Sequence, residues 1–269
     1  MRELGEYDYV IAGAGAAGCV LANRLSADSD VSVLLLEAGG RDNWIWIHIP
    51  AGYLFCIGNP RTDWCYRTEP EPGLNGRSIG YARGRVLGGS TSINAMLYLR
   101  GQARDYDQWA HLTGDDGWSW DSVLPLFRRS ESYWRGADDC HGADGEWRVE
   151  RQRLRWDVLD RVRDAAAELG IEPIEDFNRG NNAGAASFEV NQRRGVRVSA
   201  ARAFLKPAMA RPNLEVVTGA TIDRLVVEDG RARGLELMID GERCVARSRA
   251  ETILAAGSLG SPAILQRSG

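Results

Sequence analysis

A glycine-rich turn between an apolar run and an amphipathic segment constrains this chain more than any other sequence feature. Residues 7–12 form a short apolar run typical of a buried parallel strand, and they lead directly into GAGAAG at residues 13–18. Residues 19–25 then carry apolar side chains at helical spacing. Residues 31–36 form a second apolar run, which ends at Glu37. The order strand, glycine turn, helix, strand and acid predicts a Rossmann-like unit of an α/β fold.

Each residue type in this turn suits a bound dinucleotide. Gly13 permits a tight turn off the strand, Gly15 lets the backbone approach a pyrophosphate, and Gly18 lets the helix lie close to the strand. The helix N-terminus offers free N–H groups to the phosphates. Glu37 lies 19 residues after Gly18, where a carboxylate accepts hydrogen bonds from ribose hydroxyls. The turn therefore predicts a dinucleotide site, and at this point FAD and NAD both remain open.

A second glycine block, GRVLGGSTSINAMLY, occupies residues 84–98. Gly88 and Gly89 are followed by three hydroxyl residues, and such a backbone can lie against a flat ring or a phosphate. Asn94 offers both a hydrogen-bond donor and an acceptor. The block predicts a second stretch of cofactor contacts.

These motifs resemble a known family. Residues 84–109, GRVLGGSTSINAMLYLRGQARDYDQW, closely resemble the first signature of the glucose–methanol–choline (GMC) flavoprotein oxidoreductases, and residues 257–269 resemble the second. VSVLLLEAGG at residues 31–40 and TEPEP at residues 68–72 are similar to the choline-dehydrogenase-like bacterial branch. The resemblance implies FAD rather than NAD, and oxidation of an alcohol to an aldehyde or ketone by hydride transfer to the flavin.

The resemblance also implies which residues contact FAD. They are Gly13, Gly15, Ala16, Ala17, Gly18, Glu37, Ala38, Gly88, Gly89, Ser90, Asn94, Ala95, Met96, Leu97, Ile222 and Ala256. In some relatives a histidine just before the asparagine carries a covalent bond to the flavin. Ile93 occupies that position here, so we expect FAD to be bound without a covalent link.

The last third of the chain predicts an antiparallel sheet. Alternating runs at residues 222–227, 232–239 and 243–249 are separated by Asp-Gly pairs, which are strong hairpin signals. Residues 252–256 are then expected to return as a separate buried strand. The predicted fold class is α/β, a Rossmann-like FAD-binding fold with a parallel sheet and an inserted three-stranded antiparallel β-meander. We also expect helices at residues 156–169 and 199–209.

The expected domain organisation follows from the resemblance. Residues 1–269 are predicted to be the FAD-binding domain of a GMC oxidoreductase, with parts of the substrate domain inserted around residues 40–82 and 115–198. The C-terminal substrate and catalytic region is expected to be absent, and the chain to be the N-terminal part of a longer enzyme.

No catalytic residue is assigned within the chain. Its only histidines are His48, His111 and His141, and their sequence settings favour structural or surface roles. In GMC relatives the catalytic base is a histidine further downstream. A truncated FAD-binding module without activity of its own is therefore an alternative. An NAD-dependent dehydrogenase would share the first glycine turn, but it explains neither the second glycine block nor the meander.

Composition limits the partners. The formal net charge of −4, without basic clusters, argues against a nucleic-acid surface. The five cysteines show no C-x-x-C spacing, so we expect no metal site and no disulfide framework. Free thiols, with no apolar run long enough to cross a bilayer, predict a cytoplasmic protein whose partner is a small-molecule alcohol. The particular alcohol, the electron acceptor and the oligomeric state stay open.

Overall fold

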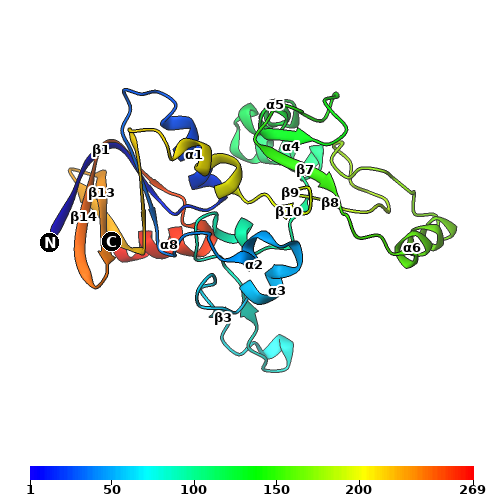
Figure 1. The fold of residues 1–269 in the computed structure, drawn as a ribbon, viewed down its shortest axis with the longest axis horizontal. Coiled ribbons are helices and arrows are strands. Elements are labelled where there is room, and N and C mark those ends of the chain that lie inside the picture. The colour runs from blue at the N-terminus through cyan, green and yellow to red at the C-terminus, as the bar shows by residue number, and fades with distance from the viewer. The chain divides into compact units, whose positions relative to one another are not determined.

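The computed structural model describes all residues from 1 to 269. The chain divides into two compact units (Figure 1). The first unit combines Met1–Ala95 with Ser199–Gly269, and the second consists of Met96–Val198. The predicted insertion at residues 40–82 falls within the first unit, and the one at residues 115–198 falls within the second.

The first unit is built on a six-stranded sheet with the order β11-β2-β1-β14-β13-β12. The strands are β1 (Arg2–Ala12), β2 (Val33–Glu37), β11 (Leu214–Thr218), β12 (Ala220–Glu228), β13 (Arg231–Ile239) and β14 (Glu242–Leu254). β1 lies in the middle and pairs in parallel with both β2 and β14, while β11 extends the parallel part beyond β2. The predicted α/β fold with a parallel sheet and an antiparallel meander is confirmed.

The turns of the meander have the predicted chemistry. Asp229 and Gly230 have φ of 50° and 72°, and Asp240 and Gly241 have φ of 50° and 81°. Positive φ at both central residues is typical of the type I′ turn, whose twist matches that of the flanking strands. The two Asp-Gly pairs therefore fix the register of the three strands.

One prediction about this sheet is wrong. The third meander strand and the returning strand, expected as separate elements at residues 243–249 and 252–256, form the single strand β14. β14 pairs with β13 at its start and lies along β1 from Cys244, opposite Arg2, to Leu254, opposite Ala12. The sequence pattern divides the strand because β14 has no β13 partner beyond Arg247, whereas its backbone continues along β1 to Leu254.

The core of the first unit lies on the face of the sheet that α8 (Gly257–Ser268) covers. Val10, Leu34, Leu235 and Leu237 are almost completely buried there, together with Ile264 of α8. The other helices of this unit are α1 (Ala16–Leu25), α2 (Ile45–His48), α3 (Tyr53–Cys56) and α7 (Lys206–Ala208), and its short strands are β3 (Tyr66–Arg67) and β4 (Gly80–Tyr81).

The helix expected at residues 199–209 is only partly α-helical. It begins as a π-helix, Ala201–Leu205, and continues as α7. Pro207 has no N–H to donate to the carbonyl four residues earlier, so it favours a wider turn at this point. The predicted helix therefore exists, with a different hydrogen-bond pattern.

The second unit contains a small sheet and three longer helices. Its four-stranded sheet has the order β5-β8-β7-β6. The elements are β5 (Leu97–Tyr98), α4 (Ala103–Thr113), α5 (Trp120–Ser130), β6 (Glu131–Tyr133), β7 (Trp147–Arg151), α6 (Asp157–Glu168), β8 (Glu189–Val190), β9 (Gln192–Arg193) and β10 (Val196–Arg197). α6 confirms the helix predicted at residues 156–169, and Gly170 follows it with a φ of 80°, as expected for a residue that ends a helix.

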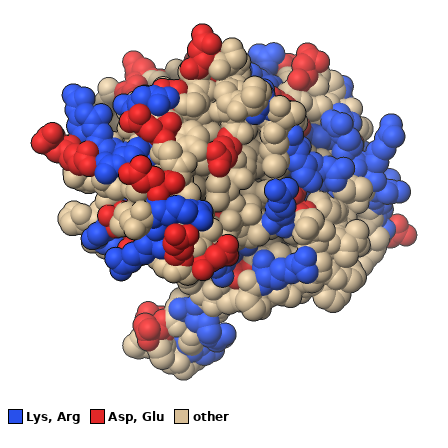
Figure 2. Space-filling view, turned by 60° about the vertical axis from the view of Figure 1, so that its left-hand side comes forward, with Lys and Arg blue, Asp and Glu red and all other residues tan.

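Acidic and basic side chains lie side by side on the left-hand part of the face in Figure 2. Within the first unit, Arg247 pairs with Glu228 at the surface and Arg249 pairs with Asp8 at 3.0 Å. Among the helices of residues 1–269, none combines the length and the apolar character that crossing a membrane requires.

Candidate functional site

The first glycine turn has a backbone that only glycine can adopt at its first position. Gly13 has a φ of 99°, and a Cβ on it would lie 2.6 Å from the carbonyl oxygen of Ala255. Its N–H donates to the carbonyl of Leu36 at 2.7 Å, which joins the ends of β1 and β2. The turn is therefore held tightly between β2 and the end of β14.

Gly18 is required by the close approach of α1. A Cβ on Gly18 would lie 1.9 Å from the carbonyl oxygen of Gly13, far inside any contact that real Cβ atoms make. The helix can begin directly above the turn only because this side chain is missing. This agrees with the role that the sequence predicted for Gly18.

Gly15 is different, because neither its φ angle nor the space around it requires glycine. Its φ is −78°, which any residue adopts, and the nearest atom to a Cβ built there is 4.0 Å away. The space next to Gly15 is open. A glycine that nothing in the chain requires, beside a helix N-terminus, is a place where a ligand can approach the backbone.

The N-terminus of α1 is free to receive an anion. No side chain caps it, and its first turn carries no acidic residue. Ala16 and Ala17 are exposed at this end. The unpaired N–H groups and the positive end of the helix dipole therefore face open space, which favours phosphate oxygens.

Glu37 sits at the end of β2 with only 5% of its surface exposed. Its carboxylate accepts hydrogen bonds from the N–H of Ala14 at 2.9 Å and from the N–H of Gly39 at 2.8 Å. Burial raises the pKa of Glu37, although these two N–H groups act in the opposite direction. A carboxylate has about four acceptor positions, so the predicted contact with a ribose remains open to it. Ala38 is half-buried between these contacts.

The second glycine block packs directly onto the first turn. The N–H of Gly88 donates to the carbonyl of Ala14 at 2.7 Å, and Gly88 has a φ of 90°. A Cβ on Gly89 would lie 2.8 Å from the Cα of Gly15. Two motifs that are more than sixty residues apart in the sequence thus form one surface.

The other predicted cofactor residues are distributed as follows. Ser90, Asn94 and Ala95 are exposed within the second glycine block, and Ala256 adjoins Gly13, whose Cβ position would lie 2.8 Å from the Cα of Ala256. Ile222 is buried within β12.

Ile93, Met96 and Leu97 are the remaining positions of interest in the second glycine block. Ile93, at the position of the covalent histidine in some relatives, is 2% exposed. Met96 and Leu97 follow along the chain as the first residues of the second unit. The structure therefore brings together the first turn, Glu37, the second glycine block and Ala256.

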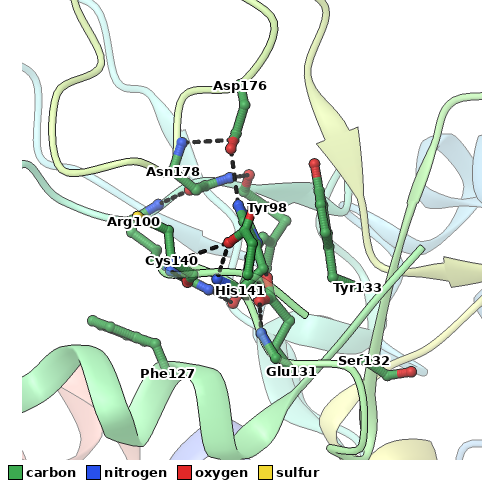
Figure 3. Close-up of polar contacts among 12 residues, drawn as sticks. Tyr98, Arg100, Phe127, Glu131, Ser132, Tyr133, Cys140, His141, Asp176 and Asn178 are labelled. Atoms are coloured by element: carbon green, nitrogen blue, oxygen red, sulfur yellow. Dashed lines mark hydrogen bonds and ion pairs between the residues drawn. The ribbon is translucent and has the colours of Figure 1, made fainter. Parts of the chain in front are cut away.

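The second unit contains a cluster of charged residues that the sequence did not predict (Figure 3). His141, expected in a turn with a structural or surface role, is completely buried between two carboxylates, those of Glu131 and Asp176. No local sequence signal marks the cluster, because its members come from distant segments. Of the other two histidines, His111 is exposed and His48 is half-buried, with burial lowering the pKa of its ring.

Comparisons with known proteins agree over nearly the whole chain. A family model described as GMC oxidoreductase matches residues 7–269. An oxygen-dependent choline dehydrogenase of Photobacterium profundum is 40% identical over 265 residues, which cover 98% of this chain and 46% of the relative. A mitochondrial choline dehydrogenase of Mus musculus is 39% identical over 271 residues, which cover 98% of this chain and 45% of the relative.

Among solved structures, a pyridoxine 4-oxidase from Mesorbium loti superposes with a TM-score of 0.94 at 38% identity. The match covers 98% of this chain and 52% of that one. The chain thus spans about half the length of the curated relatives it matches.

Proposed function

Because this chain belongs to the GMC oxidoreductase family, we propose that it binds FAD without a covalent link and forms the flavin-binding part of an alcohol oxidoreductase. The family prediction made from the two signatures, residues 84–109 and 257–269, is confirmed. The observation that carries the proposal is the open space at Gly15, beside the uncapped N-terminus of α1 and against the second glycine block. Other glycines in these motifs are explained by the packing of the chain, whereas Gly15 is explained by a ligand.

The proposed roles follow the geometry of the turn. The amides of Ala16 and Ala17 bind the pyrophosphate, and the free acceptor positions of Glu37 bind the adenosine ribose. When bound, FAD supplies the acceptor for a hydride from the alcohol carbon.

The remaining contacts extend along the flavin and the adenine. The contacts proposed along the pyrophosphate and flavin are Gly88, Gly89, Ser90, Asn94, Ala95, Met96 and Leu97. Ile222 is proposed at the adenine, and Ala38 and Ala256 close to the cofactor.

The parent enzyme is proposed to oxidise a small alcohol to an aldehyde or ketone, as the names of the choline dehydrogenase relatives suggest for those proteins. The second candidate is FAD binding without turnover. It is favoured by the state of the histidines, since His141 is enclosed by carboxylates and His111 lies on the surface of α4. We also propose a cytoplasmic location, which five cysteines outside any disulfide support.

FAD binding is tested by titrating the 269-residue chain with FAD and following flavin fluorescence, for the wild type and Gly15→Ala. A methyl group at Gly15 meets nothing in the protein but blocks the approach of a pyrophosphate. We expect unchanged folding and an affinity for FAD lowered about tenfold or more, which corresponds to about 1.4 kcal/mol or more. Gly80→Ala is the matched control, because Gly80 also has open space around it and lies in β4, outside the turn.

The result shows whether glycine at position 15 is required by a bound pyrophosphate or by the packing of the chain. Equal affinity in Gly15→Ala and the wild type would contradict the placement of the pyrophosphate, and no FAD binding by the wild type would contradict the proposal itself. Turnover is tested separately by mixing the FAD-loaded protein with choline in the absence of oxygen. Bleaching of the flavin absorbance supports catalysis by this chain, and unchanged absorbance supports the second candidate.

A further inference from the structure

Both ring nitrogens of His141 face a carboxylate. Nδ1 lies 3.0 Å from Oε2 of Glu131, and Nε2 lies 2.8 Å from Oδ2 of Asp176. A neutral imidazole has one N–H and one bare nitrogen, so it can donate to only one of these two groups. The bare nitrogen would then face a carboxylate oxygen with no proton between them. Only the imidazolium satisfies both contacts.

The surroundings of the ring balance its charge. The guanidinium of Arg100 is buried and lies 2.9 Å from Oε2 of Glu131, and it also donates to the carbonyl of Cys140 at 2.7 Å. Two buried cations, Arg100 and the protonated His141, therefore match two carboxylates, Glu131 and Asp176. Without the proton on His141, one carboxylate would remain buried without its counter-charge, which is costly.

The other titratable groups packed around the ring make no hydrogen bond to its nitrogens. The ring of Tyr133 stacks on the imidazole with centroids 3.8 Å apart, and its hydroxyl donates to Glu189 at 2.9 Å. Burial raises the pKa of Glu189, and that side chain is engaged by Tyr133 and Trp134 rather than by the histidine. Asp138 accepts hydrogen bonds from the backbone around His141 and pairs with Arg179. Tyr98 and Cys140 are the remaining titratable neighbours.

The cluster holds the segment that follows β5. The N–H of Arg100 donates to Oδ1 of Asn178 at 2.8 Å, and the side-chain amide of Asn178 donates to the carbonyl of Tyr98 at 3.3 Å. Asp176 in turn accepts the N–H of Asn178 at 2.8 Å. Through its two carboxylates, His141 thus reaches both sides of residues 98–100 (Figure 3). These residues come immediately after Met96 and Leu97.

We infer that the proton on His141 acts as a clasp of the second unit, linking residues 131–133 to residues 176–178 and, through Asn178 and Arg100, supporting residues 98–100, so that loss of this proton weakens the contacts among the three segments. This inference concerns the chain's own folding and is independent of the proposed function. The clasp lies outside the glycine turns, yet it fixes the segment that directly follows the second glycine block.

The pH range of the clasp follows from the pKa of His141. Burial alone lowers this pKa, but the hydrogen bonds to Asp176 and Glu131 outweigh burial and raise the pKa to about 9. An unfolded histidine has a pKa of about 6.5. Since the folded value is higher, the stabilisation is complete below about pH 6.5 and is lost as the pH rises to about 9. In this range, the population of opened second unit should rise by up to about tenfold per pH unit.

The protonation state is tested directly by NMR of the 269-residue chain with labelled histidines. At pH 7.5 we expect both ring nitrogens of His141 to be protonated. A neutral, single-tautomer ring at His141 at pH 7.5 would overturn the inference.

The clasp is tested by amide hydrogen exchange between pH 6 and 9.5, corrected for the intrinsic exchange rate. Protection of residues 98–100 and 131–133 should fall with rising pH in the wild type, while that of β1 and β2 stays constant. In Asp176→Asn, which removes one carboxylate and keeps the shape, the fall should be smaller and should end at least one pH unit lower, because the folded pKa of His141 decreases while its unfolded pKa is unchanged. Protection that is independent of pH in the wild type, or an unshifted fall in Asp176→Asn, would refute the clasp.

A second variant separates loss of the proton from loss of the ring. His141→Gln should have low protection of the same segments at every pH, with the pH dependence gone, whereas the matched control His111→Gln should behave as the wild type. If His141→Gln does not fold, the titration of the wild type and of Asp176→Asn still decides the outcome.

Discussion

Replacing Gly18 by alanine tests whether the close approach of α1 to the turn controls the stability of the first unit. The new Cβ would lie 1.9 Å from the carbonyl oxygen of Gly13, whereas real Cβ contacts stay beyond 3.0 Å, so the backbone must shift by about 1 Å. Gly13 cannot retreat, because its own Cβ position lies 2.6 Å from the carbonyl of Ala255. The shift therefore falls on α1 and separates it from Leu35, which lies beneath it.

Two opposing effects set how much Gly18→Ala changes the free energy of unfolding. Overpacking costs about 1–3 kcal/mol and occasionally more, and we expect the upper value because backbone meets backbone. Alanine in place of glycine inside a helix favours folding by about 1 kcal/mol. The net loss is then about 2 kcal/mol, which for a unit of this size lowers its melting temperature by about 4–8 °C.

Differential scanning calorimetry of the wild type, Gly18→Ala and the control Gly80→Ala provides the measurement. Gly80→Ala should melt within about 1 °C of the wild type, because nothing lies within 4 Å of its new methyl group. An unchanged or higher melting temperature for Gly18→Ala would mean that helix propensity outweighs the clash, and the steric argument for this turn would be wrong.

Three further predictions concern the two units. Arg100→Met should leave the Glu131 carboxylate buried without its strongest counter-charge and cost about 3–5 kcal/mol, seen as a lower melting temperature of the second unit. In Asp8, the hydrogen bond from Arg249 holds the pKa well below its usual range, so this carboxylate stabilises the fold above about pH 4 and stops doing so as the pH falls through its folded pKa. Asp8→Asn should therefore be less stable than the wild type at pH 7, with a smaller loss on acidification, measured by urea unfolding across pH 2–7. Phe204→Ala removes a completely buried ring and should cost about 3–5 kcal/mol, seen in urea as a lower midpoint with an unchanged slope.

The sequence predicts this fold well where local signals and tertiary contacts agree. The turn at residues 13–18 and the two Asp-Gly hairpins depend on backbone angles that only a few residue types adopt, so the sequence displays them directly. The sequence pattern predicts two strands where β14 is one, because the alternation of apolar residues changes where β14 no longer pairs with β13. Sequence periodicity reports the environment of the side chains and not whether the backbone strand continues. The π-turn at Ala201–Leu205 likewise depends on the single missing N–H of Pro207.

The candidate site also combines features that the sequence predicts with features that it does not. The first turn and Glu37 lie within one short segment, and their spacing alone predicts their proximity. That the second glycine block contacts Gly15 could be expected only from the family resemblance, since nothing local encodes the contact. The cluster around His141 has no sequence signal at all. Its partners Glu131 and Asp176 are ordinary acidic residues in the sequence, and only folding removes them from water and gives them a shared cation.

The glycines of the two blocks support a ligand to very different degrees. Gly13, Gly18 and Gly89 each have backbone atoms within 3 Å of where a side chain would begin, so the folded chain would require glycine there even if nothing were bound. A match to the motif at these positions therefore reports a fold. At Gly15 the chain tolerates a side chain, and the residue is nevertheless glycine. A bound ligand is thus indicated most directly by Gly15, the motif position that packing does not explain, and a substitution there separates binding from folding.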